Sequence, residues 1–373
     1  MSKSKTLIIV ESPAKCGKIE SFLGENFKCI ASYGHIRELK KDKTAYDEEN
    51  NYKPNFQLIE ARKEYLDNIK PIIKKHDDIL IATDDDREGE AIAWHICKVF
   101  KLSVKNTKRL IFNSITRDAI LTALRKPKTI NMSIVYAQRT RQILDQMLGF
   151  SVTPILWKHV SHTAKLSAGR CQTPALRLIY DRYLSIKNNT NTISYAIQGQ
   201  FINNFVFTYD KLFENHMDVK NFLKNSKTFK HILSVGKEKK SKYSPPKPLT
   251  TSVLQQRASN ELNMSPAQTM RSAQILYQEG FITYMRTDST KYSKEFVTNI
   301  NIYILKTYGL DYLKKCYHDV YKNYKFDNPI AVVNIDQDSE NFDKKTTLVQ
   351  GAHEAIRPTK IKKSMLTVDS KIK

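Results

Sequence analysis

Short apolar runs alternate with amphipathic stretches over the first part of the chain. Thr6–Val10 and Asp78–Thr83 are compact runs of aliphatic residues that are typical of buried strands, and Arg109–Phe112 is a third, shorter run. Pro13–Leu23 and Gly89–Phe100 carry apolar residues at helical spacing. Strands and helices that alternate in this order predict an α/β domain built on a largely parallel sheet.

Further along the chain the pattern becomes helical and then extended. Apolar positions recur at helical spacing through Ala137–Phe150 and Pro174–Tyr183, and the polar run Asn188–Thr192 is typical of a linker. Period-two alternation over Ser194–Thr208 and Phe229–Val235 predicts strands. The middle of the chain is therefore expected to hold a helical segment followed by a β-rich one.

A basic stretch marked by prolines, Gly236–Pro248, predicts an exposed connection between domains. Three segments with helical spacing follow it: Thr250–Leu262, Ser265–Glu279 and Ser293–Thr307, of which the second opens with the helix-start signal Ser-Pro. The pattern divides the chain into four expected parts: residues 1–130, with an insertion around 36–58, then 131–190, 191–248 and 249–373.

Composition narrows the class of partner. The 373 residues include 61 Lys and Arg against 38 Asp and Glu, a formal charge of +23. Such a surplus favours a polyanion, nucleic acid before an acidic membrane surface, although a bias towards Lys and Asn codons explains the same count. No run approaches the ~18 apolar residues of a membrane span, and the five cysteines form no CxxC pair, which disfavours a zinc ribbon or a disulfide framework.

An acidic run, residues 84–90 (DDDREGE), follows the second predicted strand directly. A glutamate ends the first predicted strand in the same way, and ligands of open α/β sheets gather at the carboxyl ends of strands. If the two strands are neighbours, four carboxylates are expected to converge there: Glu11, Asp84, Asp86 and Glu88. Their oxygens suit Mg²⁺. A solvated acidic helix start explains the run taken alone, and the second acidic strand end favours a metal site.

Several motifs resemble those of type IA DNA topoisomerases, the bacterial topoisomerase I branch in particular. They are VESPAK (10–15), GHIREL (34–39), ATDDDREGEAIAWHI (82–96), LSAGRCQTPALRL (166–178), EGFITYMRTDST (279–290) and AHEAIRP (352–358). They cover essentially the whole chain in family order. The resemblance implies a multidomain α/β plus α fold: a Toprim α/β domain in 1–130, a helical DNA-binding segment in 131–190, a β-rich arch segment in 191–248, and a helical domain in 249–373 that carries the catalytic tyrosine.

The resemblance places the nucleophile at Tyr284. A phenol with a pKa of about 10 is only about a thousandth ionised at neutral pH, so it needs help to attack phosphorus. Arg286 is expected to stabilise the phenolate and the scissile phosphate through its forked donors. By resemblance, Lys15 balances charge at the phosphate, Glu11 is the general acid for the leaving 3′-oxygen, and His353 has a supporting role.

Basic residues dominate 131–190, where 8 Lys and Arg face 2 acidic residues. A positive groove with aromatic platforms suits sequence-tolerant binding of single strands. An ordinary surface salt bridge between Arg141 and Asp145 is the alternative for that pair. The resemblance implies DNA contacts by residues of three of these motifs and of the helical stretch at 137–157: His35, Arg141, Gln142, Asp145, Phe150, Trp157, Ser167, Ala168, Gly169, Arg170, Cys171, Gln172 and Arg286.

The implied activity is that of an ATP-independent topoisomerase. It cleaves one DNA strand through a 5′-phosphotyrosyl intermediate, passes a strand and religates with the help of Mg²⁺, which relaxes negatively supercoiled DNA. Gly17-Lys18 lacks the spacing of a nucleotide-binding loop, so no nucleotide cofactor is expected. We expect a monomer that is cytoplasmic and DNA-associated, binds single-stranded or negatively supercoiled DNA, and has no membrane partner.

Two alternatives remain open at this point. After AHEAIRP the chain stops at Lys373, before the segments that close the family's gate, so a truncated DNA-binding fragment that cleaves or binds single strands without completing relaxation is one alternative. A Toprim primase or nuclease is the other, but it has no need for the YMRTDST segment. A covalent adduct with a single-stranded oligonucleotide would support Tyr284 as the nucleophile, and an adduct without plasmid relaxation would favour the truncated alternative.

Overall fold

The computed structural model describes residues 5–161, 166–189, 193–239, 241, 243, 245–313, 318 and 354–361. It forms two compact units. The larger unit comprises 1–146 and 246–373, and the smaller unit comprises 147–245. Each is described separately below.

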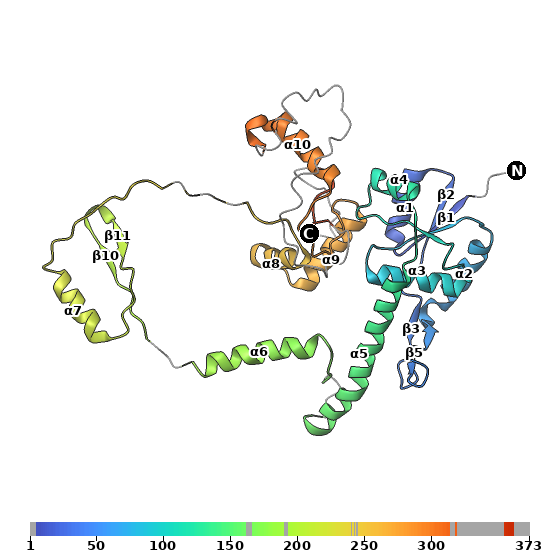
Figure 1. Ribbon diagram of the computed structural model, residues 1–373, viewed down its shortest axis with the longest axis horizontal. Coiled ribbons are helices and arrows are strands. Elements are labelled where there is room, and N and C mark those ends of the chain that lie inside the picture. Colours follow the sequence, from blue (N-terminus) through green and yellow to red (C-terminus); the bar gives the residue numbers. More distant parts are fainter. Residues whose placement is uncertain are drawn as a thin grey trace. The chain divides into compact units, whose positions relative to one another are not determined.

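A five-stranded sheet forms the centre of the larger unit, in the order β2-β1-β7-β8-β9 (Figure 1). The strands are β1 (Thr6–Val10), β2 (Phe27–Ala31), β7 (Ile79–Ala82), β8 (Lys108–Arg109) and β9 (Lys128–Thr129). All neighbours are parallel except β8 and β9. The predicted parallel α/β sheet is confirmed, with β8 shorter and one residue earlier than predicted.

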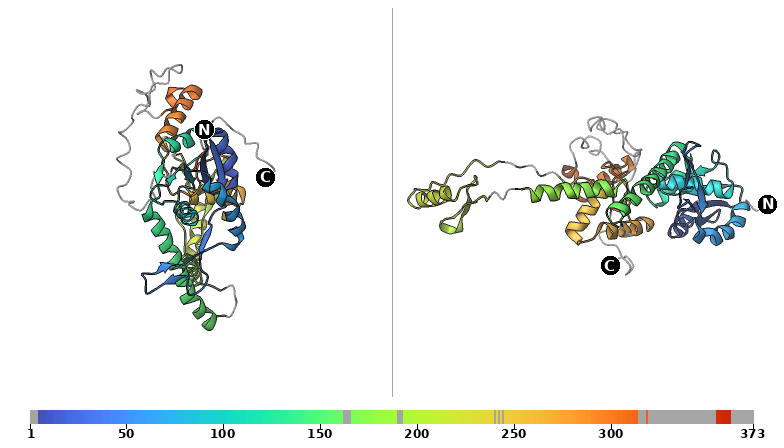
Figure 2. Two further views of the ribbon diagram at one scale, coloured as in Figure 1. Left: turned by 90° about the vertical axis from the view of Figure 1, so that its right-hand side faces the viewer. Right: turned by 90° about the horizontal axis from the view of Figure 1, so that it is seen from below.

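Helices cover both faces of this sheet (Figures 1 and 2). They are α1 (Pro13–Leu23) and α4 (Arg117–Arg125) on one face, and α2 (Lys63–Lys74) and α3 (Arg87–Phe100) on the other. Alternate residues of β1 divide between the faces: Ile8 packs with α1 and α4, and Ile9 with α2 and α3. Since β1 is thus buried on both sides, its continuous apolar run is explained.

Two small hairpins lie within the expected insertion at 36–58. The outer strands β3 (Arg37–Leu39) and β6 (Phe56–Leu58) pair antiparallel, as do the inner strands β4 (Tyr46–Asp47) and β5 (Lys53–Pro54). The insertion follows β2 and leads into α2, so it leaves the order of the central sheet unchanged.

The remainder of the larger unit is helical. The three predicted C-terminal helices are confirmed as α8 (Thr251–Leu262), α9 (Pro266–Gln278) and α10 (Lys294–Tyr308). Helix α9 begins with a capping box, in which the Ser265 hydroxyl accepts from the Gln268 amide and the Gln268 side chain accepts from the Ser265 amide. This cap fixes the start of the helix that precedes Tyr284.

The smaller unit contains the second half of α5 (Met132–His159), then α6 (Gln172–Lys187), the paired strands β10 (Gln198–Gln200) and β11 (Val206–Thr208), and α7 (His216–Ser226). The helices predicted at 137–150 and 174–183 are confirmed. The strand predicted at Phe229–Val235 is wrong, because this segment has no pairing partner and alternation alone leaves a strand's backbone groups unsatisfied. Across the described ranges, no helix has the length and apolarity that crossing a membrane requires.

Gly89, in the first turn of α3, allows a close approach of the backbone. A Cβ atom there would lie 2.1 Å from the backbone oxygen of Asp84, whereas a Cβ on Gly17, inside α1, would meet nothing within 4 Å. We expect Gly89→Ala to lower the free energy of unfolding by about 1–3 kcal/mol through overpacking. The measurement is denaturant unfolding followed by circular dichroism.

Gly17→Ala is the matched control. It adds the same methyl group inside a helix with open space around it, so it should raise the free energy of unfolding by about 0.5–1 kcal/mol. Equal shifts in the two variants would contradict the role given to Gly89.

His95 is buried in α3 and supplies a pH-dependent contribution to stability. Burial, together with the nearby charges of Arg37, His35 and Arg139, lowers the pKa of His95 to about 3 from 6.5. Between these values the unfolded chain binds the proton and the folded chain does not, so stability falls as the pH drops below 6.5, by up to about 1.4 kcal/mol per pH unit.

Replacing this imidazole should remove that dependence. Between pH 6.5 and pH 5 the unaltered chain should lose about 2 kcal/mol more of its unfolding free energy than His95→Gln loses. Urea unfolding at both pH values measures it. A difference that stays constant with pH would show that His95 does not titrate in this way.

Candidate active site

A fully buried arginine fixes the loop that leads from β7 into α3. Arg109 forms an ion pair with Glu90, and its Nε donates to the Thr83 hydroxyl at 3.1 Å. Its Nη2 donates to the backbone oxygen of Asp84 at 2.5 Å. Glu90 also accepts from the Asn131 amide at 2.6 Å. The backbone that presents the acidic run is therefore held from beneath by one guanidinium.

Asp86 is the N-cap of α3. Its Oδ1 accepts from the Gly89 amide at 2.7 Å, which satisfies a free N–H of the first turn. The Thr83 hydroxyl donates to the Gly89 oxygen at 2.7 Å on the other side of the loop. One oxygen of Asp86 is thus used by the fold, and the other points to the site.

The segment that carries Tyr284 is held by hydrogen bonds to two other parts of the chain. The Tyr284 amide donates to the Asn113 oxygen at 2.8 Å, and the Thr283 amide donates to the Arg357 oxygen at 3.0 Å. Arg357 in turn pairs with Glu354 at 2.9 Å, and the Asn113 side chain donates to Glu354 at 2.8 Å. The described part of the AHEAIRP motif therefore fastens the Tyr284 segment to the Toprim region.

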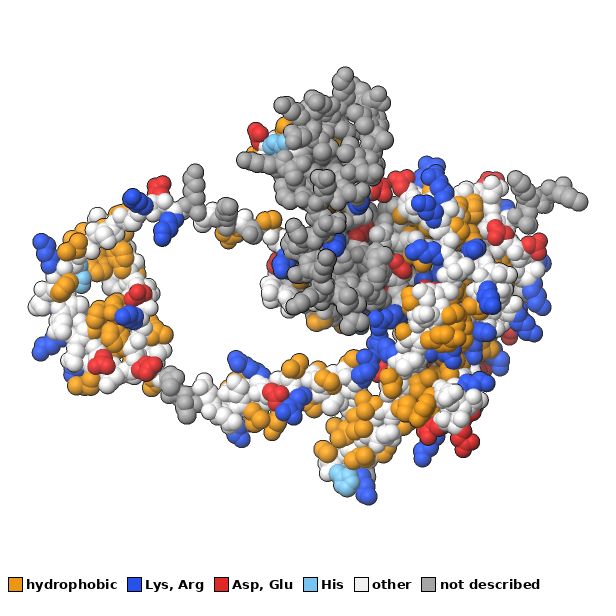
Figure 3. Space-filling model, in the orientation of Figure 1, with side chains coloured by type: hydrophobic (Ala, Val, Ile, Leu, Met, Phe, Trp, Pro, Cys, Tyr) orange, Lys and Arg blue, Asp and Glu red, His pale blue; other side chains and the backbone are white. Residues whose placement is uncertain are grey.

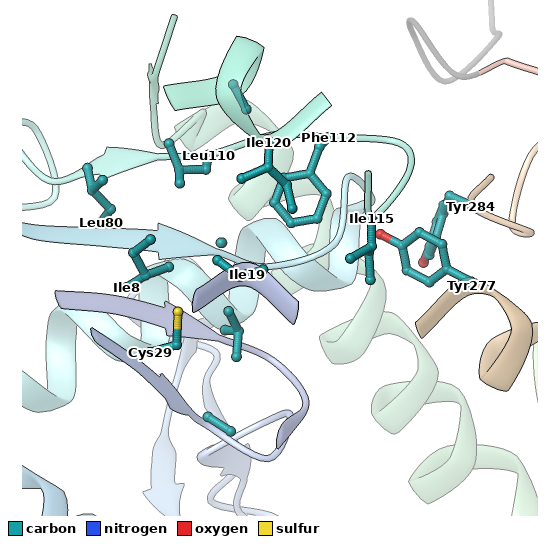
Figure 4. Close-up of a cluster of buried hydrophobic side chains, with 14 of the residues drawn as sticks. Ile8, Ile19, Cys29, Leu80, Leu110, Phe112, Ile115, Ile120, Tyr277 and Tyr284 are labelled. Atoms are coloured by element: carbon teal, nitrogen blue, oxygen red, sulfur yellow. The ribbon is translucent and has the colours of Figure 1, made fainter. Parts of the chain in front are cut away.

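Two tyrosines meet the acidic run. The Tyr284 hydroxyl donates to Asp86 Oδ2 at 2.5 Å, and the Tyr277 hydroxyl donates to Asp84 Oδ1 at 3.2 Å. Their rings lie edge to face with centroids 5.1 Å apart, as Figure 4 shows beside Ile115. Tyr284 is only 4% exposed. Tyr284 is therefore in direct contact with the acidic run.

Burial and like charge set the protonation of these groups. Burial first, and then Asp84, raise the pKa of Glu11 to about 7. Burial and the Asp86 carboxylate raise the pKa of Tyr284 well above its usual range. The hydrogen bond from His35, together with Arg286, lowers the pKa of Glu88 to about 2. At neutral pH the site thus contains a phenol, a firmly ionised Glu88 and a Glu11 that holds its proton part of the time.

Two cationic side chains form ion pairs with the acidic run. Arg286 Nη1 lies 2.9 Å from Glu88 Oε2 and 3.5 Å from Asp86 Oδ2. Lys15 is 1% exposed, forms an ion pair with Asp84 and lies over the Tyr277 ring at 5.2 Å. Lys15 is therefore placed behind Asp84, whereas Arg286 reaches the open side.

A cavity of about 560 Å³ contains the predicted centre. Its lining includes residues from the Toprim region, from the Tyr284 segment and from α9: Glu11, Asp84, Asp86, Glu88, Ala267, Met270, Arg271, Gln274, Ile275, Tyr284, Met285 and Arg286. The adjacency of β1 and β7 brings Glu11 to the acidic run, as the strand-end argument predicted.

A second cavity of about 380 Å³ shares three of these residues and extends to α5. Its lining is Asp86, Arg87, Glu88, Gln138, Arg141, Gln142, Asp145 and Arg286. His35 stands next to it, with Nε2 3.2 Å from Glu88 Oε1. Five predicted DNA contacts of the larger unit thus surround the acidic run: His35, Arg141, Gln142, Asp145 and Arg286. The Arg141–Asp145 pair, at 3.9 Å, is also present.

The other predicted DNA contacts belong to the smaller unit. Phe150 and Trp157 are 37% and 39% exposed on α5, and the Trp157 indole donates to the Leu166 oxygen at 2.7 Å. The other predicted contacts form a segment that leads into α6 and includes the first residue of that helix: Ser167, Ala168, Gly169, Arg170, Cys171 and Gln172. Within this segment, the side-chain Nε2 of Gln172 donates to the Ser167 hydroxyl at 3.1 Å.

His353 lies outside the described residues, so its predicted position stays a prediction. Within the described ranges, no group of three or more His, Cys, Asp or Glu is arranged to hold a metal ion, because the acidic oxygens point to protein donors. The donor chemistry still fits Mg²⁺, which needs only one or two carboxylates beside its waters. Burial is the main cause of the raised pKa of Glu11, and the neighbouring charges of Asp84 and Asp86 add to it; a cation would relieve this second contribution.

Several residues of the site were missed by the sequence interpretation. Tyr277 is fully buried against Asp84, Arg109 holds the acidic loop, and Gln138 lines the second cavity. Gln138 stands three residues before the predicted Arg141, on the same face of the helix, so helical spacing was a usable signal. Tyr277 and Arg109 sit in apolar contexts that give no such signal.

Comparison with known proteins agrees with this geometry. The Toprim domain family matches residues 6–115, and a DNA topoisomerase family matches residues 129–372. The structure of full-length topoisomerase I from Thermotoga maritima is 34% identical, with a TM-score of 0.75, over 95% of this chain and 55% of that one. The chain thus spans about half the length of that relative. Its Toprim region, acidic run and tyrosine segment follow one family pattern throughout, and the chain belongs to the type IA DNA topoisomerases.

Proposed function

We propose that the chain cleaves and rejoins one strand of DNA without a nucleotide cofactor, through a covalent bond between Tyr284 and the 5′-phosphate. The observation that carries the proposal is the Tyr284 hydroxyl, which donates to Asp86 at 2.5 Å inside the carboxylate-lined cavity. A phenol with a raised pKa needs a base at contact distance to become a nucleophile, and Asp86 occupies that position.

In the cleavage step, one bond to phosphorus forms as another breaks, and each proton passes to or from a carboxyl group. The Tyr284 oxygen attacks phosphorus while its proton passes to Asp86, and the bond from phosphorus to the 3′-oxygen breaks. The leaving oxygen takes a proton from Glu11, which the raised pKa keeps partly protonated near neutrality. Arg286, half exposed and at the mouth of both cavities, faces the charge on the phosphoryl oxygens. Rejoining reverses each transfer.

We infer that Asp84 and Asp86 would hold Mg²⁺ beside the cleaved ends, with Glu11 and Glu88 adjacent. When bound, the cation supplies charge compensation and orientation for the 3′-hydroxyl. Lys15 keeps Asp84 in position through their buried ion pair, which is a positioning role. His353 is proposed only as a supporting residue on the basis of its motif.

The substrate of this reaction is single-stranded or negatively supercoiled DNA. Arg141, Gln142 and Asp145 line the cavity next to Arg286, which supports a strand that runs from the acidic run along α5. The exposed aromatic side chains Phe150 and Trp157 suit base stacking. Lys and Arg side chains, blue in Figure 3, are spread across the visible face of the larger unit and would contribute a salt-dependent attraction.

Relaxation of supercoiled DNA by a monomer is the fuller form of the proposal. The alternative is cleavage or binding of single strands without strand passage, since the chain spans 55% of the relative from Thermotoga. A plasmid relaxation assay beside an oligonucleotide cleavage assay separates the two. Adduct with relaxation supports the first, and adduct without relaxation supports the second.

Tyr284→Phe should abolish the covalent adduct with a labelled single-stranded oligonucleotide, because the attacking oxygen is gone. Denaturing gel electrophoresis of the mixture measures the adduct. Tyr292→Phe is the control, since Tyr292 is 38% exposed and outside both cavities. An adduct that persists in Tyr284→Phe would sink the assignment of the nucleophile.

Removal of divalent metal should separate cleavage from rejoining. With EDTA the adduct should accumulate, because Tyr284, Asp86 and Glu11 supply the proton transfers of cleavage themselves. Addition of Mg²⁺ should then decrease the adduct and restore intact oligonucleotide, measured on the same gels. If chelation instead prevents the adduct from forming, cleavage itself depends on the metal and this division of roles is wrong.

A further inference from the structure

Helix α9 forms a wall of the active-site cavity, and nothing in the sequence patterns assigned it a role there. Its cavity-lining residues are spaced three and four apart: Ala267, Met270, Arg271, Gln274 and Ile275. The opposite face of the helix holds the buried residues Thr269, Ala273 and Tyr277. Because three- and four-residue spacing defines one face of a helix, α9 presents a continuous stripe to the cavity. At its end, the Gln278 side chain donates to the Ser12 hydroxyl at 3.2 Å.

The charges of the cavity are unevenly matched. Arg286 is paired with Glu88 and Asp86, and Lys15 is paired with Asp84. Arg271 is exposed and, within the part of the chain that the structure describes, forms no hydrogen bond or ion pair. Arg271 is therefore available to bind an anionic group of a ligand.

A DNA backbone that enters this cavity brings phosphates on both sides of the bond to be cut. The four carboxylates repel those phosphates, so a separate cation has to balance them. A guanidinium offers forked donors that match phosphate oxygens, and the side-chain amide of Gln274 on the same wall offers one more donor. Met270 and Ile275 on the same wall suit the apolar faces of the sugars.

We propose that Arg271 binds a backbone phosphate that flanks the scissile phosphate, with Gln274 as a second donor to the same strand. The inference rests on the proposed function, because it names a further contact of the same substrate. Arg271 acts in binding and stands apart from the groups that transfer protons. Its loss should therefore change affinity far more than the rate of cleavage at saturating DNA.

The experiment measures binding of a single-stranded oligonucleotide by fluorescence anisotropy at several salt concentrations, with the full chain. Arg271→Ala should weaken binding roughly three- to tenfold, and the slope of log K against log salt should become shallower by about 0.7. Arg271→Lys should restore part of both. The single-turnover rate of adduct formation at saturating DNA should stay within about twofold of the unaltered chain.

Arg257→Ala is the matched control. Arg257 is also exposed on a helix of the larger unit, but it pairs with Glu261 at 2.8 Å and lies outside the cavity lining. It should leave affinity and salt slope unchanged. A further test uses oligonucleotides in which one phosphate near the cut is replaced by an uncharged methylphosphonate. At one position this replacement should lower the affinity of the unaltered chain, and at that position it should not change the affinity of Arg271→Ala.

The outcomes separate the two proposals. Failure of the unaltered chain to form any adduct contradicts the proposed reaction. If the chain forms the adduct but Arg271→Ala changes neither the affinity for DNA nor the salt slope, the phosphate contact alone is overturned. The same holds if Arg257→Ala lowers the affinity as much as Arg271→Ala does. Loss confined to Arg271→Ala, with rescue by lysine and the position-specific methylphosphonate effect, supports it.

Discussion

A guanidinium buried without exposure to water, that of Arg109, is the constraint on which the site depends. It neutralises Glu90 and satisfies the Thr83 hydroxyl and the Asp84 backbone oxygen, so three polar groups share one desolvated cation. Breaking such a buried pair by removing one partner costs about 3–5 kcal/mol, because the other charge stays uncompensated. The carboxylates above it can therefore repel one another without unravelling the loop that carries them.

The site is assembled from distant parts of the chain. Glu11 ends β1, the acidic run follows β7, Tyr284 comes after α9, and residues 354–359 fasten the tyrosine segment in place. Tyr277 links two of these parts, since its ring lies in the hydrophobic cluster and its hydroxyl reaches Asp84. Packing and the candidate site thus use the same residues, and the geometry of Tyr284 depends on the integrity of the core.

Much of this arrangement follows from the order of strands and helices. The apolar runs at 6–10 and 78–83 predicted strands of a largely parallel sheet, and the adjacency of these strands in the structure brings Glu11 to Asp84. The pairing of Tyr284 with Asp86 needed the family pattern, because no local rule connects residues so far apart in sequence. Arg109 was unpredictable for a physical reason: a charged residue within a short apolar run is indistinguishable from a surface position until its buried partner is known. The alternation at Phe229–Val235 misled because a strand requires a neighbour as well as a pattern.

The hydrogen bond from Tyr284 to Asp86 makes the phenol a satisfied and nearly inaccessible group before any DNA arrives. In the proposed reaction a strand has to reach a tyrosine that is 4% exposed while the contact with Asp86 is kept, so part of the interaction free energy of binding would be consumed in opening access to Tyr284. Under the proposed function, the dissociation constant for DNA would therefore understate the strength of the contacts that hold the strand. Tyr284 would then become reactive only when DNA occupies the cavity, and would be protected from other reactions in the unbound state.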